Sequence, residues 1–328
     1  MWLHFLLQKT ENFLNELSCY VVMVYKMNMK INVRGKTKGM GWFPDYPDFR
    51  DYTLENKVIK PMAKAMRVAV PAKEGEKLPK VVDLRQWCSS IEDQETIGSC
   101  TANAGVGLVE YYERKAFGKH IDASRLFLYK VTRNLLHAKG DTGAYLRTTM
   151  GALVLFGVPP EEYWPYTAQD PYYDQEPPAF CYSFAQSYQA IKYLRLDPPG
   201  TRAEKLLSQI KTLLAAGLPL IFGFTVFNGS IEQATYDKGM IPFPCEGDSV
   251  SGGHAVMAVG YDDKMEIENS ACEKTTTVGA VQIRNSWSEE WGDMGYGWLP
   301  YEYVLKGLAI DWWTLLSKEW VDTHEFGF

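Results

Sequence analysis

Four polar residues of this 328-residue chain stand in sequence contexts that could support nucleophilic thiol chemistry. Cys100 follows a Gly-Ser pair and opens a long helical pattern, and Gln94 lies six residues before it. His254 follows two glycines at the head of an apolar strand pattern, and Asn285 begins an Asn-Ser-Trp stretch. A thiol at a helix N-terminus lies near the positive end of the helix dipole, which favours the nucleophilic thiolate. Each residue alone is more often structural, but the four together favour catalysis.

These residue types match the steps of amide hydrolysis, which needs a nucleophile stronger than water and donors for the oxyanion. Cys100 would attack as a thiolate paired with a protonated His254, which would then protonate the leaving amine and activate water. Asn285 would fix the orientation and tautomer of the imidazole, and Trp287 would shield that bond from water. Gln94 and the backbone N–H of Cys100 would form the oxyanion hole.

The other cysteines do not form a metal-binding pattern. No two cysteines are close enough for a C-x-x-C pair, so a structural zinc site is not expected, and neither metal nor cofactor is predicted. The wide spacing of the cysteines is compatible with one or two disulfides but does not require them. The following are expected to be structural or free rather than catalytic: Cys88, Cys181, Cys245 and Cys272.

Periodicity predicts helices before strands, and hence an α+β fold with two lobes and a cleft between them. Helices are expected at Ser99–Phe117, Ser124–Leu136 and Ala144–Phe156. Thr201 and Glu204 form a capping-box pattern for a helix that ends near Gly217. Strands rich in β-branched and aromatic residues are expected at Leu218–Phe227, His254–Tyr261, Val278–Trp287 and Ile310–Leu316.

At these motifs the chain resembles the papain family of cysteine peptidases, and prokaryote-type members more than lysosomal ones. The order Gln94, Cys100, His254, Asn285 is that of the family, and Asn-Ser-Trp, Trp-Gly and Gly-Tyr elements surround Asn285. The resemblance covers about residues 78–316. It implies a papain-like fold with a helical lobe, an antiparallel β-barrel-like lobe, and the active site in the cleft between them.

The sequence also departs from the family pattern. Ile97 stands where the family has a disulfide-forming cysteine, so that bridge should be absent, and Thr101 replaces an aromatic residue. Thr142-Gly143-Ala144 stands where the family has the loop that pairs with substrate, which implies substrate contacts at Gly143 and Ala144. Ala255 and the strand Leu218–Phe224 are expected to line the main specificity pocket, with Phe222 and Phe224 on one face. A polar segment, Asp262–Thr277, is inserted between two strands.

The predicted organisation has three parts. Residues 1–77 form a leader, residues 78–167 a helical lobe with the nucleophile, and residues 168–328 a β-rich lobe with His254 and Asn285, with the crossing at Ala168–Pro178. In the leader, the aromatic stretch Gly41–Tyr52 is predicted to lie extended on another surface, a short helix to span Asn56–Arg67, and Pro71–Pro79 to be a linker. The leader is either a packing arm or a cover of the active site.

Composition limits the partners. A formal charge of −6 without a dense basic run makes nucleic acid an unexpected partner. The apolar runs Trp2–Leu7 and Cys19–Tyr25 are too short to span a membrane. The lack of a well-formed signal peptide favours the cytoplasm over secretion, whereas the start residue and oligomeric state stay open.

The sequence therefore predicts a cysteine endopeptidase that acts on peptides or proteins through a thioester. Two alternatives stay open: an exopeptidase or acyl-transferring ligase at the same site, and a non-catalytic peptide binder, which Thr101 and Ala144 favour.

Overall fold

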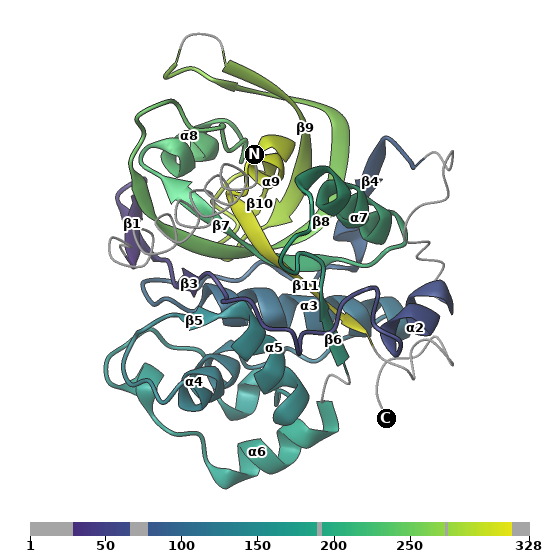
Figure 1. The fold of residues 1–328 in the computed structure, drawn as a ribbon. Helices are drawn as coiled ribbons and strands as arrows, with labels where there is room; N and C mark the ends of the chain where they lie inside the picture. Colours follow the sequence, from purple (N-terminus) through teal and green to yellow (C-terminus); the bar gives the residue numbers. More distant parts are fainter. Residues whose placement is uncertain (1–28, 66–77, 189–191, 273–274, 317–328) are drawn as a thin grey trace, which may run out of the picture.

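The computed structural model describes residues 29–65, 78–188, 192–272 and 275–316. Helices α3, α4, α5 and α6 lie below a large antiparallel sheet in the view of Figure 1. Both predicted hydrophobic runs near the N-terminus lie outside the described residues, as does most of the predicted linker.

Helix α3 (Cys100–Phe117) lies at the centre of the molecule, between the other helices and the sheet (Figure 1). It begins at the predicted cysteine and ends before Gly118, whose φ of 71° closes the last turn. The sequence indicated an amphipathic helix, but every residue from Cys100 to Glu113 is buried. An amphipathic pattern predicts one solvent-exposed face, but α3 is packed on both sides and has none over these residues. The sequence pattern therefore predicted less burial than the structure shows.

Three further helices pack on α3 or on one another: α4 (Arg125–Leu135), α5 (Leu146–Leu155) and α6 (Ala179–Ala185). Ser124 caps α4, because its side chain accepts a hydrogen bond from the Phe127 amide. Tyr182 of α6 packs edge-on against Phe127 and Phe156. The chain therefore stays with the helices through α6, and the crossing to the sheet comes after the predicted segment Ala168–Pro178.

The main sheet is antiparallel throughout, with the strand order β10–β9–β8–β7–β11–β6 and β4 paired to β8. Its strands are β4 (Val81–Asp83), β6 (Lys192–Arg195), β7 (Leu220–Phe227), β8 (Val250–Asn269), β9 (Thr275–Arg284), β10 (Tyr296–Pro300) and β11 (Ala309–Leu316). Residues 81–83 thus belong to the sheet although they precede the helices. Helices α7 (Ala203–Ala215), α8 (Ser230–Tyr236) and α9 (Tyr301–Leu305) accompany the sheet, and single 3-10 turns lie at Arg85–Trp87, Glu161–Tyr163, Tyr172–Asp174 and Gln186–Tyr188.

The start of α7 differs from the predicted capping box. The residue before the helix is Arg202, without a side-chain cap, and the Thr201 hydroxyl donates to the Pro198 carbonyl instead. Pro198 and Gly200 bend the chain just ahead of the helix, and the bend takes the threonine out of capping position.

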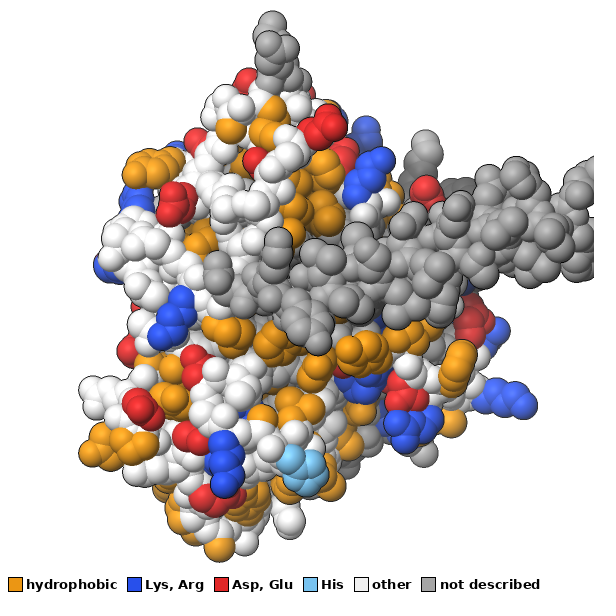
Figure 2. Space-filling model, turned by 60° about the vertical axis from the view of Figure 1, so that its left-hand side comes forward, with side chains coloured by type: hydrophobic (Ala, Val, Ile, Leu, Met, Phe, Trp, Pro, Cys, Tyr) orange, Lys and Arg blue, Asp and Glu red, His pale blue; other side chains and the backbone are white. Residues whose placement is uncertain are grey.

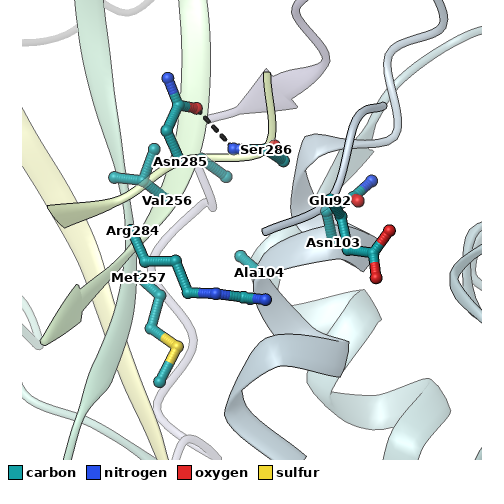
Figure 3. Close-up of a pocket in the computed structure, with 9 residues that line it drawn as sticks. Glu92, Asn103, Ala104, Val256, Met257, Arg284, Asn285 and Ser286 are labelled. Carbon is teal, nitrogen blue, oxygen red and sulfur yellow. Dashed lines mark hydrogen bonds between the residues drawn. The ribbon is translucent and has the colours of Figure 1, made fainter. Parts of the chain in front are cut away.

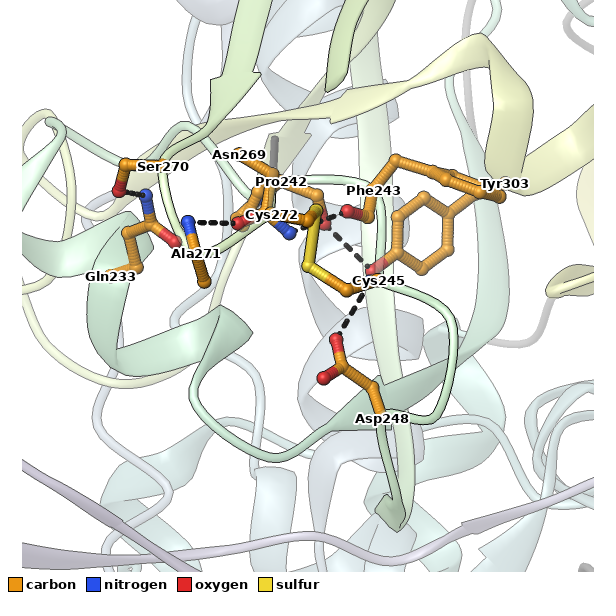
Figure 4. Close-up of a disulfide and its surroundings, with 10 residues drawn as sticks. All are labelled: Gln233, Pro242, Phe243, Cys245, Asp248, Asn269, Ser270, Ala271, Cys272 and Tyr303. Carbon is orange, nitrogen blue, oxygen red and sulfur yellow. Dashed lines mark hydrogen bonds between the residues drawn. A yellow bond between two sulfur atoms is a disulfide. The ribbon is translucent and has the colours of Figure 1, made fainter. Parts of the chain in front are cut away.

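The predicted insertion Asp262–Thr277 is not a loop between two strands. Most of it extends β8 and β9, which pair from Glu266↔Val278 to Asn269↔Thr275. Cys272 at the tip forms a disulfide with Cys245, and Asn269 donates to the Phe243 carbonyl at 2.8 Å (Figure 4). The hairpin and the loop before β8 are thus joined both covalently and by hydrogen bonds.

The leader is part of the fold. Strands β1 (Lys30–Val33) and β2 (Lys36–Gly39) form a hairpin, β3 (Trp42–Phe43) pairs in parallel with β5 (Ala144–Tyr145), and α2 (Ile59–Ala65) follows. The β3–β5 pairing explains why α5 begins at Leu146 and not at Ala144. Buried apolar side chains of the leader include Val33, Met40, Trp42, Leu54, Ile59 and Met62.

The surface carries charges of both signs. Lys and Arg side chains alternate with Asp and Glu over the face in Figure 2. No helix among the described residues is long and apolar enough to cross a membrane, and no three His, Cys, Asp or Glu side chains of that part gather as a metal site.

Candidate active site

Cys100 is the first residue of α3 and is fully buried. Burial raises the pKa of its thiol to about 11, and the nearby backbone amides of Ala255 and Gly41 oppose that rise. The sulfur therefore lies beside the residue that follows His254, and beside the leader. A pKa this high keeps the thiol protonated at neutral pH, which differs from the predicted thiolate, because burial outweighs the helix dipole while the leader is in place.

The His254 imidazole lies on β8 and is held on three sides. Its Nε2 is 2.8 Å from Asn285 Oδ1, which also accepts from the Ser286 amide at 2.8 Å. Trp287 stacks on the ring with centroids 4.5 Å apart, and Phe224 meets it edge-on. Because Asn285 Oδ1 can only accept, Nε2 carries a proton. Burial lowers the pKa of His254 to about 4, against the bond to Asn285, so the ring is neutral at pH 7.

Nδ1 of His254 is buried and has no hydrogen-bond partner within the described part of the chain. A neutral ring protonated at Nε2 has its lone pair at Nδ1. The backbone amide of Ala255, the next residue, lies at the Cys100 sulfur. The ring nitrogen that remains free is thus the one able to take a proton.

The Gln94 side chain is fixed by the opposite lobe. Its Oε1 accepts from the Ser286 hydroxyl at 2.6 Å, and its backbone amide donates to the Ser286 carbonyl at 2.8 Å. Its Nε2 donates to the carbonyls of Gly39 and Ile97, both at 3.0 Å. The donor predicted for an oxyanion is therefore occupied by a leader carbonyl. Ser286 was not predicted to act here, although it lies inside the Asn-Ser-Trp motif.

The leader backbone fills the region predicted for substrate. The Ala144 amide donates to the Gly41 carbonyl at 2.7 Å, and a Cβ added to Gly143 would lie 2.4 Å from that oxygen. Added Cβ atoms at Gly39 and Gly41 would each lie 2.0 Å from a carbonyl oxygen, of Ile97 and Gly98. Only glycine allows this close approach of two backbones.

The Trp42 side chain occupies the predicted specificity pocket. A Cβ added to Gly223 on β7 would lie 1.9 Å from its indole, and Gly223 pairs in register with Ala255. Phe222 and Phe224 point to the other face of the strand, where Phe222 stacks on Trp312 with centroids 3.9 Å apart. The two phenylalanines are thus core residues, and the glycine between them makes the room.

A small cavity of about 10 Å³ lies between the first turn of α3, residues 255–257 near the start of β8, and the end of β9. Figure 3 shows Asn285 and Ser286 on the strand side, Asn103 and Ala104 on α3, and the Arg284 side chain extending from the strands toward α3 beside Ala104. Asn103 Oδ1 and Arg284 Nε are buried and have no hydrogen-bond partner among the residues that the structure describes. The cavity has room for about one water molecule and none for a peptide.

Comparison with known proteins agrees on one family. The sequence profile of papain family cysteine proteases matches residues 78–305. An uncharacterized peptidase C1-like protein of Acanthamoeba polyphaga mimivirus is 33% identical over 287 residues, which cover 85% of this chain and 87% of the relative. Pro-cathepsin H of Medicago truncatula is 25% identical, over 83% of this chain and 73% of that protein.

Among solved structures, xylellain, a cysteine protease from Xylella fastidiosa, matches with a TM-score of 0.68 and 31% identity, over 88% of this chain and 99% of xylellain. Bromelain from Ananas comosus matches with a TM-score of 0.52 at 20% identity, which concerns the fold alone. The viral and Xylella matches cover a larger share of the chain than the part after residue 77 contains, so they include leader residues.

Proposed function

The chain belongs to the papain family of cysteine proteases and acts on peptides or proteins, and we propose that it cleaves internal peptide bonds through a thioester on Cys100. The observation that carries the proposal is the His254 ring, which Asn285 holds at 2.8 Å and whose Nδ1 has no hydrogen-bond partner among the described residues, while the Cys100 sulfur lies beside the backbone amide of the next residue, Ala255. The leader backbone passes the site from Gly39 to Phe43 without a chain end, which supports an endopeptidase, because a bound chain then needs no terminus at the site.

In the proposed reaction His254 Nδ1 takes the proton of the Cys100 thiol once the leader has left and water reaches the site. The sulfur attacks the carbonyl carbon, and Gln94 Nε2 donates to the oxyanion in place of the Gly39 carbonyl. The C–N bond breaks as His254 returns its proton to the amine nitrogen. Water, deprotonated by His254, then hydrolyses the thioester and regenerates the thiol.

The test uses a peptide blocked at both ends and mass analysis of its products. Wild-type protein should cut it internally, and Cys100→Ala should reduce the rate to background. Cys88→Ala and Cys181→Ala are matched controls, since both residues are buried free cysteines whose thiols donate to the carbonyls of Leu84 and Tyr163. Release of terminal residues from unblocked peptides alone would indicate an exopeptidase, and adducts with added amines would indicate a ligase. Full activity of Cys100→Ala would refute the assignment.

We also propose that residues before 78 hold the enzyme inactive until they are displaced. The support is that Gly39 occupies the Gln94 donor, Gly41 lies at the Cys100 sulfur, and Trp42 fills the pocket over Gly223. The leader thus occupies three parts of the site that a substrate would need: the oxyanion donor, the nucleophile and the side-chain pocket.

Gly41→Val should displace this strand, because its Cβ would lie 2.0 Å from the Gly98 carbonyl oxygen, which no side-chain rotation relieves. We expect alkylation of Cys100 by iodoacetamide to become at least about tenfold faster than in the wild-type chain. A tenfold change corresponds to a loss of about 1.4 kcal/mol in the free energy of leader docking. Phe49→Val is the control, since Phe49 belongs to the leader and is fully exposed. Equal alkylation rates in all three full-length chains would show that the leader does not limit access.

A further inference from the structure

A cluster of buried charges joins the leader to the two lobes. Two arginines, Arg147 on α5 and Arg195 on β6, face four aspartates: Asp45 and Asp51 of the leader, and Asp197 and Asp311 of the body. All six side chains are at least three-quarters buried. Both guanidinium groups are permanently charged. An arginine that loses its carboxylate partners when the leader leaves therefore needs a new anionic partner.

The acidic partners of Arg147 come from the leader. Its Nη1 lies 3.2 Å from Asp45 Oδ1, and its Nε and Nη2 form a fork to Asp51 at 2.8 and 2.7 Å. Nη2 also donates to the Tyr46 carbonyl at 2.7 Å. Within the described residues, no carboxylate outside the leader forms an ion pair with Arg147.

The N-terminus of α5 contributes to the same site. Tyr145 precedes the helix and offers no side-chain cap, and the Arg147 backbone amide instead donates to Asp45 Oδ2 at 2.8 Å. Asp45 therefore caps α5 from the leader while it also contacts the guanidinium of Arg147. A carboxylate held by an arginine and a first-turn amide uses charge, hydrogen bonding and the helix dipole together.

Arg195 differs from Arg147 because its partners lie in the body of the protein. Asp197 accepts from its Nε at 3.0 Å and Asp311 from its Nη2 at 2.5 Å. Its contact with Asp51 of the leader is longer, at 3.8 Å. Departure of the leader would leave Arg195 neutralised but would take both carboxylates from Arg147.

We propose that Arg147 and the first turn of α5 form a carboxylate-binding subsite of the cleft, which selects an acidic side chain in the substrate after the leader leaves. The inference rests on the proposed peptidase function and on displacement of the leader. Asp45 follows Trp42 by three residues, so the subsite lies within a few residues of the pocket over Gly223. The substrate class is therefore a peptide with an aromatic residue and an Asp or Glu a short distance along the chain.

The binding test uses the full-length chain with the cleft opened by Gly41→Val, Asp45→Asn and Asp51→Asn, and with Cys100→Ala to prevent turnover. The probes are fluorescein-labelled alanine peptides with one Trp and one Asp, placed two to four residues to either side, each with an Asn counterpart. Fluorescence polarisation gives their Kd values. At least one Asp peptide should bind about tenfold more tightly than its Asn counterpart, which corresponds to about 1.4 kcal/mol.

Arg147→Gln should remove that preference, and Arg147→Lys should retain part of it, because lysine keeps the charge but not the fork. Arg85→Gln is the matched control, since Arg85 is a more exposed arginine paired with Asp83 and Asp293, and the preference should persist. Equal binding of every Asp and Asn pair, a preference that survives Arg147→Gln in a chain with unchanged circular dichroism, or no binding of any probe would overturn the subsite.

Turnover separates this inference from the function on which it rests. In the same open chain with Cys100 restored, the Asp and Asn peptides are compared by kcat/KM. Cleavage of both at equal rates would refute the subsite and leave the peptidase assignment intact. An Asp preference in binding without any cleavage would refute the peptidase assignment and leave the subsite intact.

Discussion

At the scale of single residues, Asn285 has the most clearly defined role in positioning the imidazole. Its Oδ1 accepts from both the His254 ring and the Ser286 amide, so its orientation is fixed by its own neighbour along the chain. Trp287 then covers the ring face at 4.5 Å. The ring can rotate away only if it breaks the hydrogen bond and the stacking contact together.

Asn285→Ala should therefore lower kcat/KM about 10- to 100-fold, because it leaves a buried N–H of His254 unsatisfied, at a cost of about 1–3 kcal/mol. Steady-state kinetics on a fluorogenic peptide would measure the loss. Asn269→Ala is the control, since that buried asparagine lies on the same strand as His254 but donates to the Phe243 carbonyl. A kcat/KM equal to that of wild type would contradict the positioning role.

The sequence was sufficient to predict which residues form the site, but not the protonation state of Cys100. The order of Gln94, Cys100, His254 and Asn285 was sufficient to expect their joint action. The raised pKa of Cys100 was not predictable, because it depends on burial that the leader helps to provide from far away in the chain. The strand Leu218–Phe224 was expected to line the pocket, but Gly223 within it was not singled out, since its role appears only with Trp42 packed against it.

At the scale of elements, local patterns predicted helices α3, α4, α5 and α7 and strands β7, β8, β9 and β11, but not β6, β10 or α6, and distant partners changed the limits of several predicted elements. Ala144 and Tyr145 read as the start of a helix, but they pair with Trp42 and Phe43 as strand β5. The predicted strand His254–Tyr261 is the middle of β8, which continues to Asn269 because β9 pairs with its polar end. Neither partner is visible in a local window of sequence.

The Cys245–Cys272 disulfide is an element-scale feature that spacing alone left open. A sequence separation of 27 residues predicts stabilisation of about 3–4 kcal/mol from the reduced entropy of the unfolded chain. Cys245→Ser with Cys272→Ser should therefore lower Tm by several degrees, measured by calorimetry without reductant. Wild-type protein in reductant should show the same shift. An unchanged Tm would indicate that the hairpin is stable without the bond.

This disulfide also bears on the compartment. Disulfides persist in oxidising compartments and are rare in the cytosol. From this bond we propose an oxidising compartment, in place of the cytoplasm expected from the lack of a well-formed signal peptide.

At the scale of the whole molecule, the leader is both a packing arm and a cover of the cleft. The sequence left these two interpretations open, because composition alone did not show which surface the leader covers. In the structure Val33, Ile59 and Met62 are buried as core residues, while Gly39 and Trp42 occupy the cleft. Displacement of the leader thus costs hydrophobic burial as well as site contacts, so cutting the linker alone should not release it.

The charges beneath the leader determine how its docking responds to pH. Burial in the docked leader raises the pKa of Asp45 to about 6, and Asp51 adds to the rise. The backbone amide and guanidinium of Arg147, which form the proposed subsite, and the charge of Arg195 oppose it, so Arg147 itself favours a carboxylate. Burial and then the charge of Asp45 raise the pKa of Asp311 as well. Because Asp45 holds its proton more tightly when the leader is docked, docking takes up protons at Asp45. The contribution of Asp45 is fully present below its ordinary pKa of 3.8 and is lost as the pH rises through about 6.

Lowering the pH should therefore stabilise the docked leader and not release it. We expect hydrogen exchange of the amides in Lys36–Phe43, corrected for intrinsic rates, to show about tenfold greater protection at pH 5 than at pH 7.5. In Asp45→Asn the dependence should largely disappear, because an amide does not titrate, whereas Asp48→Asn should keep it, since Asp48 faces solvent beside Arg50. Protection that falls on acidification in the wild-type chain, or the same profile in Asp45→Asn, would mean that other groups control the docking of the leader.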